Sequence, residues 1–307
     1  MNKSVTYIIV TWNNENEIEN CLKTLFEFSP SDSKVIVVDN NSSDKTVELI
    51  SSHYPNVNLI SSKENLGFAK ANNVALDQVE TDFICYLNPD VILTEDFVTD
   101  SMLKLNEFPE IGIVAARLKN LDMTHQQSTF NFATSKTMFI DVLHLSKLMP
   151  KSLKRKFGLS AFNPVSDFYP DWVIGAEMVL RTADAKAING FSTEYFMYTE
   201  DMDLCKKVLD YLNKRTYYLS SKSLIHIGGA SEVQNVSYDK QKKMFENIIL
   251  FVEKFYSGVE AKKTVSNMIL AYSIRKILLK LFYKHDDKKI QIDKTSQALQ
   301  ILRELKQ

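Results

Sequence analysis

A carboxylate at the end of an apolar run is the first feature that indicates chemistry. Residues 83–87 are apolar throughout and are followed by Asn88-Pro89-Asp90. Such a run is typical of a strand buried on both faces, and Pro89 must end it because proline has no N–H to donate to a sheet. Asp90 then lies at the carboxyl end of a central strand, where open α/β sheets bind ligands. A carboxylate there holds a divalent cation, which in turn holds a diphosphate. The alternative is a helix N-cap.

A second acidic group lies in the C-terminal half of the chain. Glu200, Asp201 and Asp203 follow Thr199, which predicts a helix capped by Thr199 with three acids in its first turn. Acids in this position interact favourably with the helix dipole, so a purely structural role is the simpler interpretation. Three acids are more than capping requires, so a catalytic role stays open.

Alternating strands and helices must position these residues. Apolar, β-branched runs predict strands over residues 5–10, 35–38, 58–60, 83–87, 111–116 and 216–219. Helical spacing of apolar residues follows the first three runs. This alternation predicts an α/β fold with a mostly parallel central sheet flanked by helices.

Composition excludes several classes of function. The chain of 307 residues has only 8 glycines, of which Gly67 is the first, so the loop after the first strand has neither a dinucleotide-binding glycine motif nor a P-loop. A net charge of -1 argues against a dedicated nucleic-acid binder. Three cysteines without metal-type spacing fit a reducing compartment.

Four motifs in matching order resemble those of family 2 glycosyltransferases with the GT-A fold. They are Ile9–Asn13, Val38–Asp44, Asn65–Asn73 and Leu87–Asp90. The chain is most similar to the rhamnosyltransferase branch that builds bacterial surface polysaccharides. The resemblance runs from about Val5 to Ser231 and implies a catalytic domain over residues 1–237, with a nucleotide-sugar half (1–116) and an acceptor half (117–237).

The resemblance assigns donor-binding roles to the N-terminal half. Asp39 would accept a hydrogen bond from the N3–H of uracil or thymine, which suits a carboxylate. The other residues implied in nucleoside, ribose, diphosphate or sugar binding are Thr11, Asn13, Glu15, Asn41, Asn65, Lys70, Asn72 and Asn88. For residues 41–44 a turn and helix cap is the alternative, which their composition favours.

The resemblance also implies a metal site and a catalytic base. Asn88-Pro89-Asp90 stands where many relatives have Asp-x-Asp, so Asp90 is the expected ligand of Mn²⁺ or Mg²⁺. His226 precedes a Gly-Gly pair where the family has a histidine that contacts metal and diphosphate, although a lone histidine on a strand is more often structural. Trp172 and Gly175 belong to the segment beside the donor sugar and acceptor. Asp201 is the expected general base, with Glu200 second and Asp203 structural or acceptor-binding.

The remaining residues, 238–307, predict a helical extension. Residues 268–283 are apolar with intervening cations, which favours a helix lying on anionic lipid. The alternative is a bundle helix packed on the catalytic domain or on a second subunit of a homodimer. No window is apolar enough to span a bilayer, so we expect a cytoplasmic protein, peripheral at the inner face of the membrane. Residues 293–307 predict a solvent-exposed helix.

Together these features predict an inverting, metal-dependent glycosyltransferase. Its expected donor is a dTDP- or UDP-sugar, with dTDP-rhamnose foremost, and its expected acceptor is a lipid-linked glycan. A sugar nucleotidyltransferase is one alternative, but it normally has a glycine-rich basic loop after the first strand. A non-catalytic nucleotide-sugar-binding module is another, against which the Glu200-Asp201 pair argues.

Overall fold

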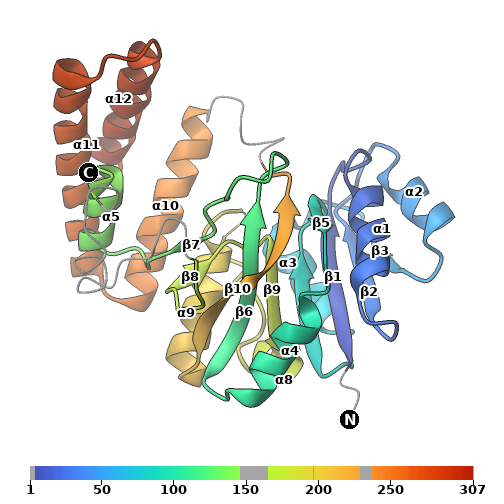
Figure 1. Ribbon diagram of the computed structural model, residues 1–307. Coiled ribbons are helices and arrows are strands. Elements are labelled where there is room, and N and C mark those ends of the chain that lie inside the picture. The colour runs from blue at the N-terminus through green and yellow to red at the C-terminus, as the bar shows by residue number, and fades with distance from the viewer. Residues whose placement is uncertain (1–3, 146–164, 196, 229–236, 307) are drawn as a thin grey trace. The chain divides into compact units, whose positions relative to one another are not determined.

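The computed structural model describes residues 4–145, 165–195, 197–228 and 237–306 (Figure 1). The chain divides into two compact units. One, the sheet unit, comprises Met1–Phe130 and Ala161–Ser231, and the other, the helical unit, comprises Asn131–Ser160 and Glu232–Gln307.

An eight-stranded sheet forms the centre of the sheet unit, in the order β3-β2-β1-β4-β9-β6-β10-β5. Its strands are β1 (Val5–Thr11), β2 (Lys34–Asp39), β3 (Asn58–Ser61), β4 (Phe83–Leu87), β5 (Val91–Leu93), β6 (Ile111–Lys119), β9 (Glu177–Arg181) and β10 (Arg215–His226). A separate small sheet pairs β7 (Thr129–Phe130) with β8 (Trp172–Val173). Neighbouring strands from β3 to β4 are parallel, which confirms the predicted sheet.

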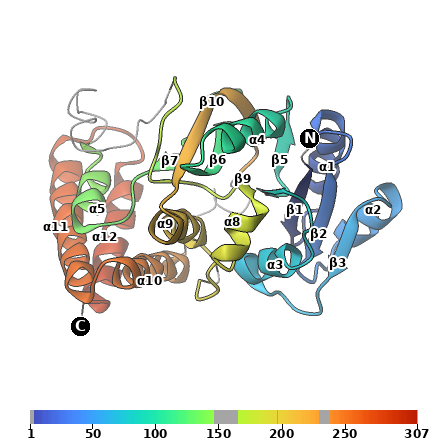
Figure 2. The same ribbon diagram turned by 90° about the horizontal axis from the view of Figure 1, so that it is seen from below.

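Helices cover both faces of this sheet, as Figure 2 shows. One face packs against α1 (Ile18–Phe28), α2 (Thr46–His53) and α4 (Val98–Glu107), and the other against α3 (Gly67–Leu76), α8 (Thr182–Ala187) and α9 (Glu200–Leu212). Every residue of β1 and β4 is buried as a result. This two-sided cover explains why the strands are continuous apolar runs instead of alternating ones.

Most strands end at the same edge of the sheet. β9 is antiparallel to both β4 and β6, and β10 is parallel to β6, so β1, β2, β3, β4, β6 and β10 all point the same way. We call the edge where they end the carboxyl edge; it is uppermost in Figure 1. β9 begins at this edge. The topology therefore brings together Asp39, Asn88, Asp90 and His226, which end or directly follow three of these strands.

The sheet also differs from the sequence-based expectation. Asp90 is followed at once by β5 and not by a helix, since α4 begins only at Val98. The N-cap alternative for Asp90 is therefore wrong. The predicted strand over 216–219 is part of the longer β10, which contains a register shift against β6 between Leu219 and Ser223.

The helical unit contains α5 (Ser135–Val142), α10 (Tyr238–Phe255), α11 (Gly258–Phe282) and α12 (Lys288–Glu304). α11 contacts the other three helices, around a core of Phe245, Met268, Ala298, Ile301 and Leu302. The expectation of a solvent-exposed last helix is wrong, because α12 buries one face in this core. No helix in the described part of the chain is both long and apolar enough to cross a membrane.

A buried carboxyl group lies at the start of β9. Glu177 is 1% exposed; its Oε1 accepts a hydrogen bond from the Ala116 N–H, and its Oε2 has no partner among the described residues. Ladder pairing between β6 and β9 involves Ile113 and Val114, so the Glu177 side chain bonds to β6 beyond that pairing. Burial raises the pKa of Glu177 well above its ordinary value, while the hydrogen bond from Ala116 lowers it.

We expect Glu177→Gln to stabilise the protein at pH 8 but not near pH 5. When folding raises the pKa of a carboxyl group, its full contribution to the stability of the folded protein is present only below the pKa that the group has in the unfolded chain. The contribution falls as pH rises toward the pKa that the group has in the folded protein. Glutamine keeps the acceptor for Ala116 without a titratable proton. Thermal unfolding should give a Tm gain of at least about 2–4 °C at pH 8, the shift that 1 kcal/mol produces in a domain of this size.

Glu48→Gln is the matched control, since Glu48 is exposed on α2. Its Tm should change by the same small amount at both pH values. A Glu177→Gln shift that does not depend on pH would contradict the assignment of a neutral, buried Glu177.

Candidate active site

The nucleoside end of the site is built around Asp39 at the end of β2. Asp39 is 2% exposed, and its Oδ2 accepts the Ser42 N–H at 3.0 Å. Its Oδ1 is buried with no hydrogen-bond partner among the described residues. An unpaired buried acceptor is costly, and a ligand N–H would satisfy it. Thr11 is its register partner on β1, so both predicted residues meet at the carboxyl edge.

Three of the other predicted residues of the first two loops form hydrogen bonds to loop residues that were not predicted. The Thr11 hydroxyl donates to Asn14 Oδ1, the Asn13 Oδ1 accepts the Ser43 N–H at 2.8 Å, and the Glu15 Oε2 accepts the Lys45 N–H at 3.0 Å. Asn41 has φ +65, a conformation that asparagine tolerates better than most residues. The Asn13 and Glu15 side chains thus cross-link the loops after β1 and β2 and so shape the wall of the site.

An unassigned residue connects this wall to α3. Asn40 is 3% exposed; its Oδ1 accepts the Leu66 N–H and its Nδ2 donates to the Gly67 carbonyl. The only sequence signal for it was its place inside the Val38–Asp44 motif.

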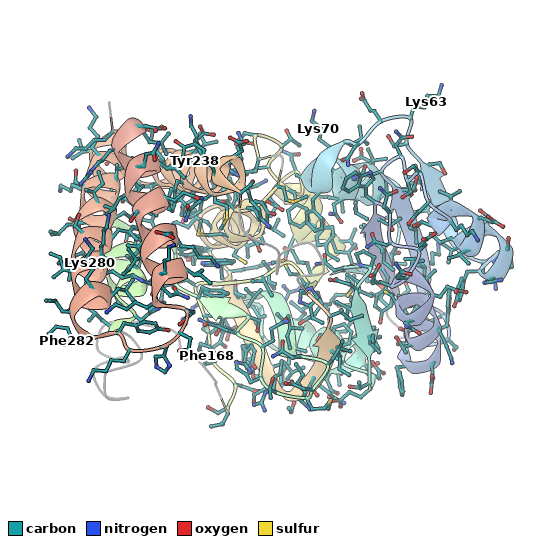
Figure 3. The ribbon with its side chains drawn as sticks, turned by 90° about the horizontal axis from the view of Figure 1, so that it is seen from above. Lys63, Lys70, Phe168, Tyr238, Lys280 and Phe282 are labelled. Carbon is teal, nitrogen blue, oxygen red and sulfur yellow. The ribbon has the colours of Figure 1, made fainter. Side chains whose placement is uncertain are left out.

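The three residues predicted on and before α3 have different positions. The Asn65 Oδ1 accepts the Gly67 N–H at 2.9 Å and so supports the start of the helix. Lys70 extends outward from the surface of α3 (Figure 3). Asn72 is buried and donates to the Phe68 carbonyl at 3.0 Å, as a packing residue would. The structure therefore brings Asn65 to the start of α3 but does not expose Asn72.

The two predicted metal ligands lie side by side. His226 Nε2 is 3.3 Å from Asp90 Oδ1, and the Ile227 N–H donates to the Asp90 carbonyl. A second side chain, Gln126, faces the other nitrogen of the ring, with its Oε1 2.7 Å from His226 Nδ1. The Gln126 Nε2 donates to Asn120 and to the His226 carbonyl, which leaves its Oε1 as the acceptor. Nδ1 is therefore the donor to Gln126, and Nε2 is the ring nitrogen that faces Asp90.

This geometry fits a divalent cation. Two adjacent ligands of an octahedral ion, each at about 2.1 Å, are about 3 Å apart, close to the separation of the Asp90 and His226 atoms. No cluster of three or more metal-binding His, Cys, Asp or Glu side chains occurs in the described residues. The described residues thus offer two candidate ligands, and diphosphate oxygens and water would complete the shell, as is usual for Mg²⁺.

Gly228 is needed beside this pair. It has φ +41, and a Cβ at this position would lie 3.0 Å from His226 Nδ1 and 3.1 Å from Gln126 Nε2. A side chain would therefore push apart the histidine and the glutamine that orients it. Gln126 had no sequence signal beyond its place in a polar stretch.

Hydrogen bonds link Asp201 to the same edge. The Asp201 Oδ2 accepts the Gly175 N–H at 3.1 Å, and the carbonyl of the next residue, Ala176, accepts the Asn88 N–H at 2.9 Å. Asn88 lies two residues before Asp90. A Cβ on Gly175 would meet Asp201 Cβ at 3.5 Å, so Gly175 lies directly against the acid. The structure therefore brings together Asp90, Asn88, Gly175 and Asp201.

Glu200 is buried beside Asp201. Burial and the negative charge of Asp201 raise the pKa of Glu200 to about 8, although hydrogen bonds from backbone N–H groups, including that of Tyr198, lower it. Thr199 has φ +82 and its side chain makes no cap, so the predicted Thr199 cap is wrong. A β-branched residue with positive φ is strained, and such strain is common at functional sites.

Two further predicted residues, Asp203 and Trp172, pack against neighbouring side chains. Asp203 is fully buried, and its carboxylate accepts hydrogen bonds from the hydroxyls of Ser192 and Tyr195. This contact anchors the first turn of α9 to the segment before it. Trp172 on β8 stacks on Phe130 of β7, with ring centroids 4.7 Å apart.

Comparison with known families identifies the class. Residues 6–164, more than half of the chain, match the family model described as Glycosyl transferase family 2. The chain belongs to glycosyl transferase family 2. It is therefore a glycosyltransferase, and the family and enzyme class predicted from the sequence are confirmed.

Relatives within this family include rhamnosyltransferases. Rhamnosyltransferase WbbL of Escherichia coli (strain K12) is 28% identical over 236 residues, which cover 72% of this chain and 83% of that protein. The N-acetylglucosaminyl-diphospho-decaprenol L-rhamnosyltransferase of Mycobacterium tuberculosis is 23% identical over 233 residues, covering 71% and 74%. The predicted resemblance to the rhamnosyltransferase branch is thus confirmed.

Solved structures share the fold. S. aureus TarS 1-349 in complex with UDP matches 99% of this chain and 90% of that chain, with a TM-score of 0.55 and 17% identity. The mannosyltransferase PcManGT from Pyrobaculum calidifontis, in complex with GDP-Man and Mn²⁺, matches 98% and 86%, with a TM-score of 0.60 and 13% identity. The predicted GT-A fold is confirmed.

Proposed function

We propose that this glycosyltransferase transfers a sugar with inversion from a pyrimidine nucleotide sugar to a lipid-linked glycan, with dTDP-rhamnose as the foremost donor. The observation that carries the proposal is the connection of Asp201 to the Asp90–His226 pair: Asp201 accepts the Gly175 N–H, the Ala176 carbonyl accepts the Asn88 N–H, and Asn88 lies two residues before Asp90. It joins an acid to a cation site at one edge of the sheet. The names of the rhamnosyltransferase relatives support the sugar, and the mycobacterial name supports the acceptor.

Each side chain has a role in the proposed transfer. The open Asp39 Oδ1 accepts the imide N–H of the base, as its unpaired burial favours. Asp90 and His226 would hold Mn²⁺ or Mg²⁺, which would supply positive charge beside the diphosphate. Asp201 accepts the proton of the acceptor hydroxyl while the oxygen of that hydroxyl forms a bond to C1 of the donor sugar. The bond from C1 to the phosphate oxygen breaks, and the nucleoside diphosphate leaves with that electron pair.

Glu200 supports Asp201 in this scheme. Two neighbouring carboxyl groups whose environments differ commonly divide between a neutral and an ionised form. With a pKa of about 8, Glu200 is largely neutral at pH 7, so Asp201 is the member left to act as base.

A donor panel tests the proposal and separates it from its rivals. UDP- and dTDP-sugars are incubated with the protein, Mn²⁺ and a prenyl-diphosphate-linked sugar acceptor, and nucleotide products are resolved by chromatography. We expect nucleoside diphosphate release, fastest from dTDP-rhamnose. Pyrophosphate formation from a nucleoside triphosphate and a sugar phosphate would instead indicate a nucleotidyltransferase. Donor binding without any turnover would favour a non-catalytic module.

A further inference from the structure

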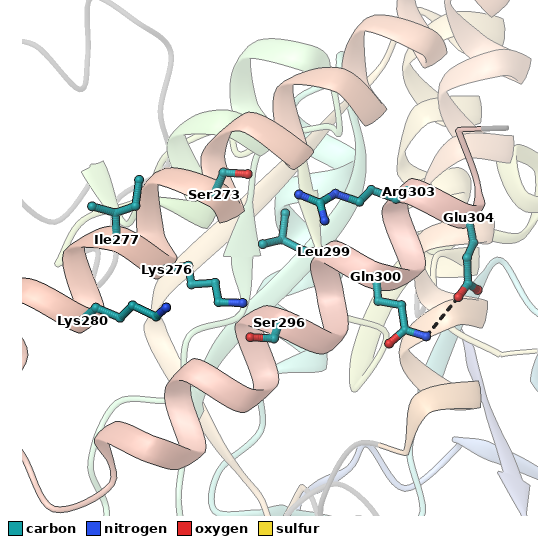
Figure 4. A pocket seen from close by; sticks show the side chains of 9 residues that line it. All are labelled: Ser273, Lys276, Ile277, Lys280, Ser296, Leu299, Gln300, Arg303 and Glu304. Carbon is teal, nitrogen blue, oxygen red and sulfur yellow. Dashed lines mark hydrogen bonds between the residues drawn. The ribbon is translucent and has the colours of Figure 1, made fainter.

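A cationic groove lies in the helical unit between α11 and α12 (Figure 4). It has a volume of about 480 Å³. Lys276 and Lys280 project into it from α11 and Arg303 from α12, and the buried Leu299 forms part of its floor. Three cations of the described residues, from two consecutive helices, thus face one small volume.

Among the described residues that line the groove, Glu304 is the one carboxylate, and it is bound to other side chains. Glu304 accepts hydrogen bonds from the Tyr238 hydroxyl and from Gln300 Nε2. The bond from Tyr238, followed by that from Gln300, holds the pKa of Glu304 below its ordinary value, so this group remains an anion. The lining therefore has a surplus of two positive charges, counting three cations against one carboxylate. Such a surplus attracts a phosphate.

An apolar ridge borders the groove on α11. Residues Ser273, Lys276, Ile277 and Lys280 recur at spacings of three and four, so they form one stripe that lines the groove. Leu281 and Phe282 continue the helix beyond that stripe and are 66% and 71% exposed, and Ile277 is 58% exposed. Large apolar side chains gathered beside cations are typical of a surface that meets lipid.

We propose that this groove binds the phosphate of an anionic phospholipid headgroup while the ridge of Ile277, Leu281 and Phe282 enters the acyl boundary. The inference rests on the proposed function, because it supplies the means by which the enzyme meets a lipid-linked acceptor. Binding of a dissolved phosphate ion would require only the cations of the groove and not the apolar ridge. The adjoining ridge is what favours a lipid as the source of the phosphate.

Vesicle co-sedimentation of the full chain tests the groove. Phosphatidylcholine vesicles with and without phosphatidylglycerol are compared for wild type, for a groove variant (K276E/K280E/R303E) and for a matched control (K262E/K263E/K294E). The control residues are exposed on the same two helices and give the same change in net charge. We expect about 100-fold weaker binding to anionic vesicles for the groove variant, from about 1 kcal/mol, or about fivefold, for each of the three cations. The control variant should bind anionic vesicles less than about tenfold more weakly than wild type.

A second variant separates the lipid from a dissolved phosphate. L281S/F282S should weaken vesicle binding by at least about tenfold, while its thermal stabilisation by inorganic phosphate stays that of wild type. Equal losses in the groove and control variants would overturn the proposal, and so would an unchanged affinity of L281S/F282S for vesicles. Nucleoside diphosphate release is measured in parallel without vesicles. Wild type that releases no product contradicts the proposed function and leaves the vesicle result standing.

Discussion

Asp201→Asn lowers kcat by about 10²–10⁴-fold in our account, which is the range for loss of a general base. Asparagine has the same shape, and its one side-chain oxygen can accept the Gly175 N–H in place of Asp201 Oδ2. Of the hydrogen bonds described for Asp201, only that from the Met202 N–H to Asp201 Oδ1 is then lost, so the local fold should persist. Its amide does not take up a proton. Donor affinity should therefore stay within a few fold of wild type, because the acceptor hydroxyl and not the donor loses its partner.

Steady-state kinetics and calorimetric donor titration measure these two quantities separately. Asp210→Asn on the same helix is the control, since Asp210 is exposed and pairs only with Lys206 in the interactions described for it. Full activity of Asp201→Asn would remove the base assignment. A parallel loss of donor binding would indicate instead that Asp201 holds the sugar.

Asp90→Ala has the second large expected effect. It should weaken donor binding at least about 100-fold when Mn²⁺ or Mg²⁺ is present, because the described residues contribute two ligands to the proposed site and Asp90 is one of them. With a chelator present, wild type and variant should bind donor equally weakly.

Calorimetric titration of the nucleoside diphosphate, with and without metal, measures both affinities. His226→Gln should share the metal-dependent part of the loss, whereas Asp77→Ala, at an exposed position after α3, should bind as wild type does. A loss of affinity that is the same with and without metal would mean that Asp90 is not a cation ligand.

Local sequence predicted the central strands because their chemistry is local. β1, β2 and β4 are buried on both faces, so each is an unbroken apolar run whose end is marked by a polar residue. The order of such strands in a parallel sheet follows from short crossovers. This is why Asp39 and Asp90 could be placed at one edge from the sequence alone.

Contacts between distant segments could not be predicted in the same way. β9 is only five residues long, and it inserts antiparallel between β4 and β6. Its place decides that Gly175 lies between Asn88 and Asp201, and that the Glu177 carboxyl is buried. Likewise Gln126 lies 100 residues before His226, and no periodicity connects them.

The C-terminal residues show a similar limit. Helical spacing predicted α10 and α11, and the cations among apolar residues marked α11 as unusual. The core that α11 shares with α12, and its contact with α5, depend on tertiary packing, which the pattern of one segment does not contain. The groove with Arg303 arises only from that packing.

The most direct measurement of the central claim is a crystal structure with a dTDP-sugar and Mn²⁺, using anomalous scattering to locate the ion. The account predicts Mn²⁺ at about 2.1–2.3 Å from an Asp90 oxygen and from His226 Nε2. It also predicts that the anomeric carbon faces the Asp201 carboxylate. Mn²⁺ bound away from Asp90, or a sugar directed away from Asp201, would contradict it.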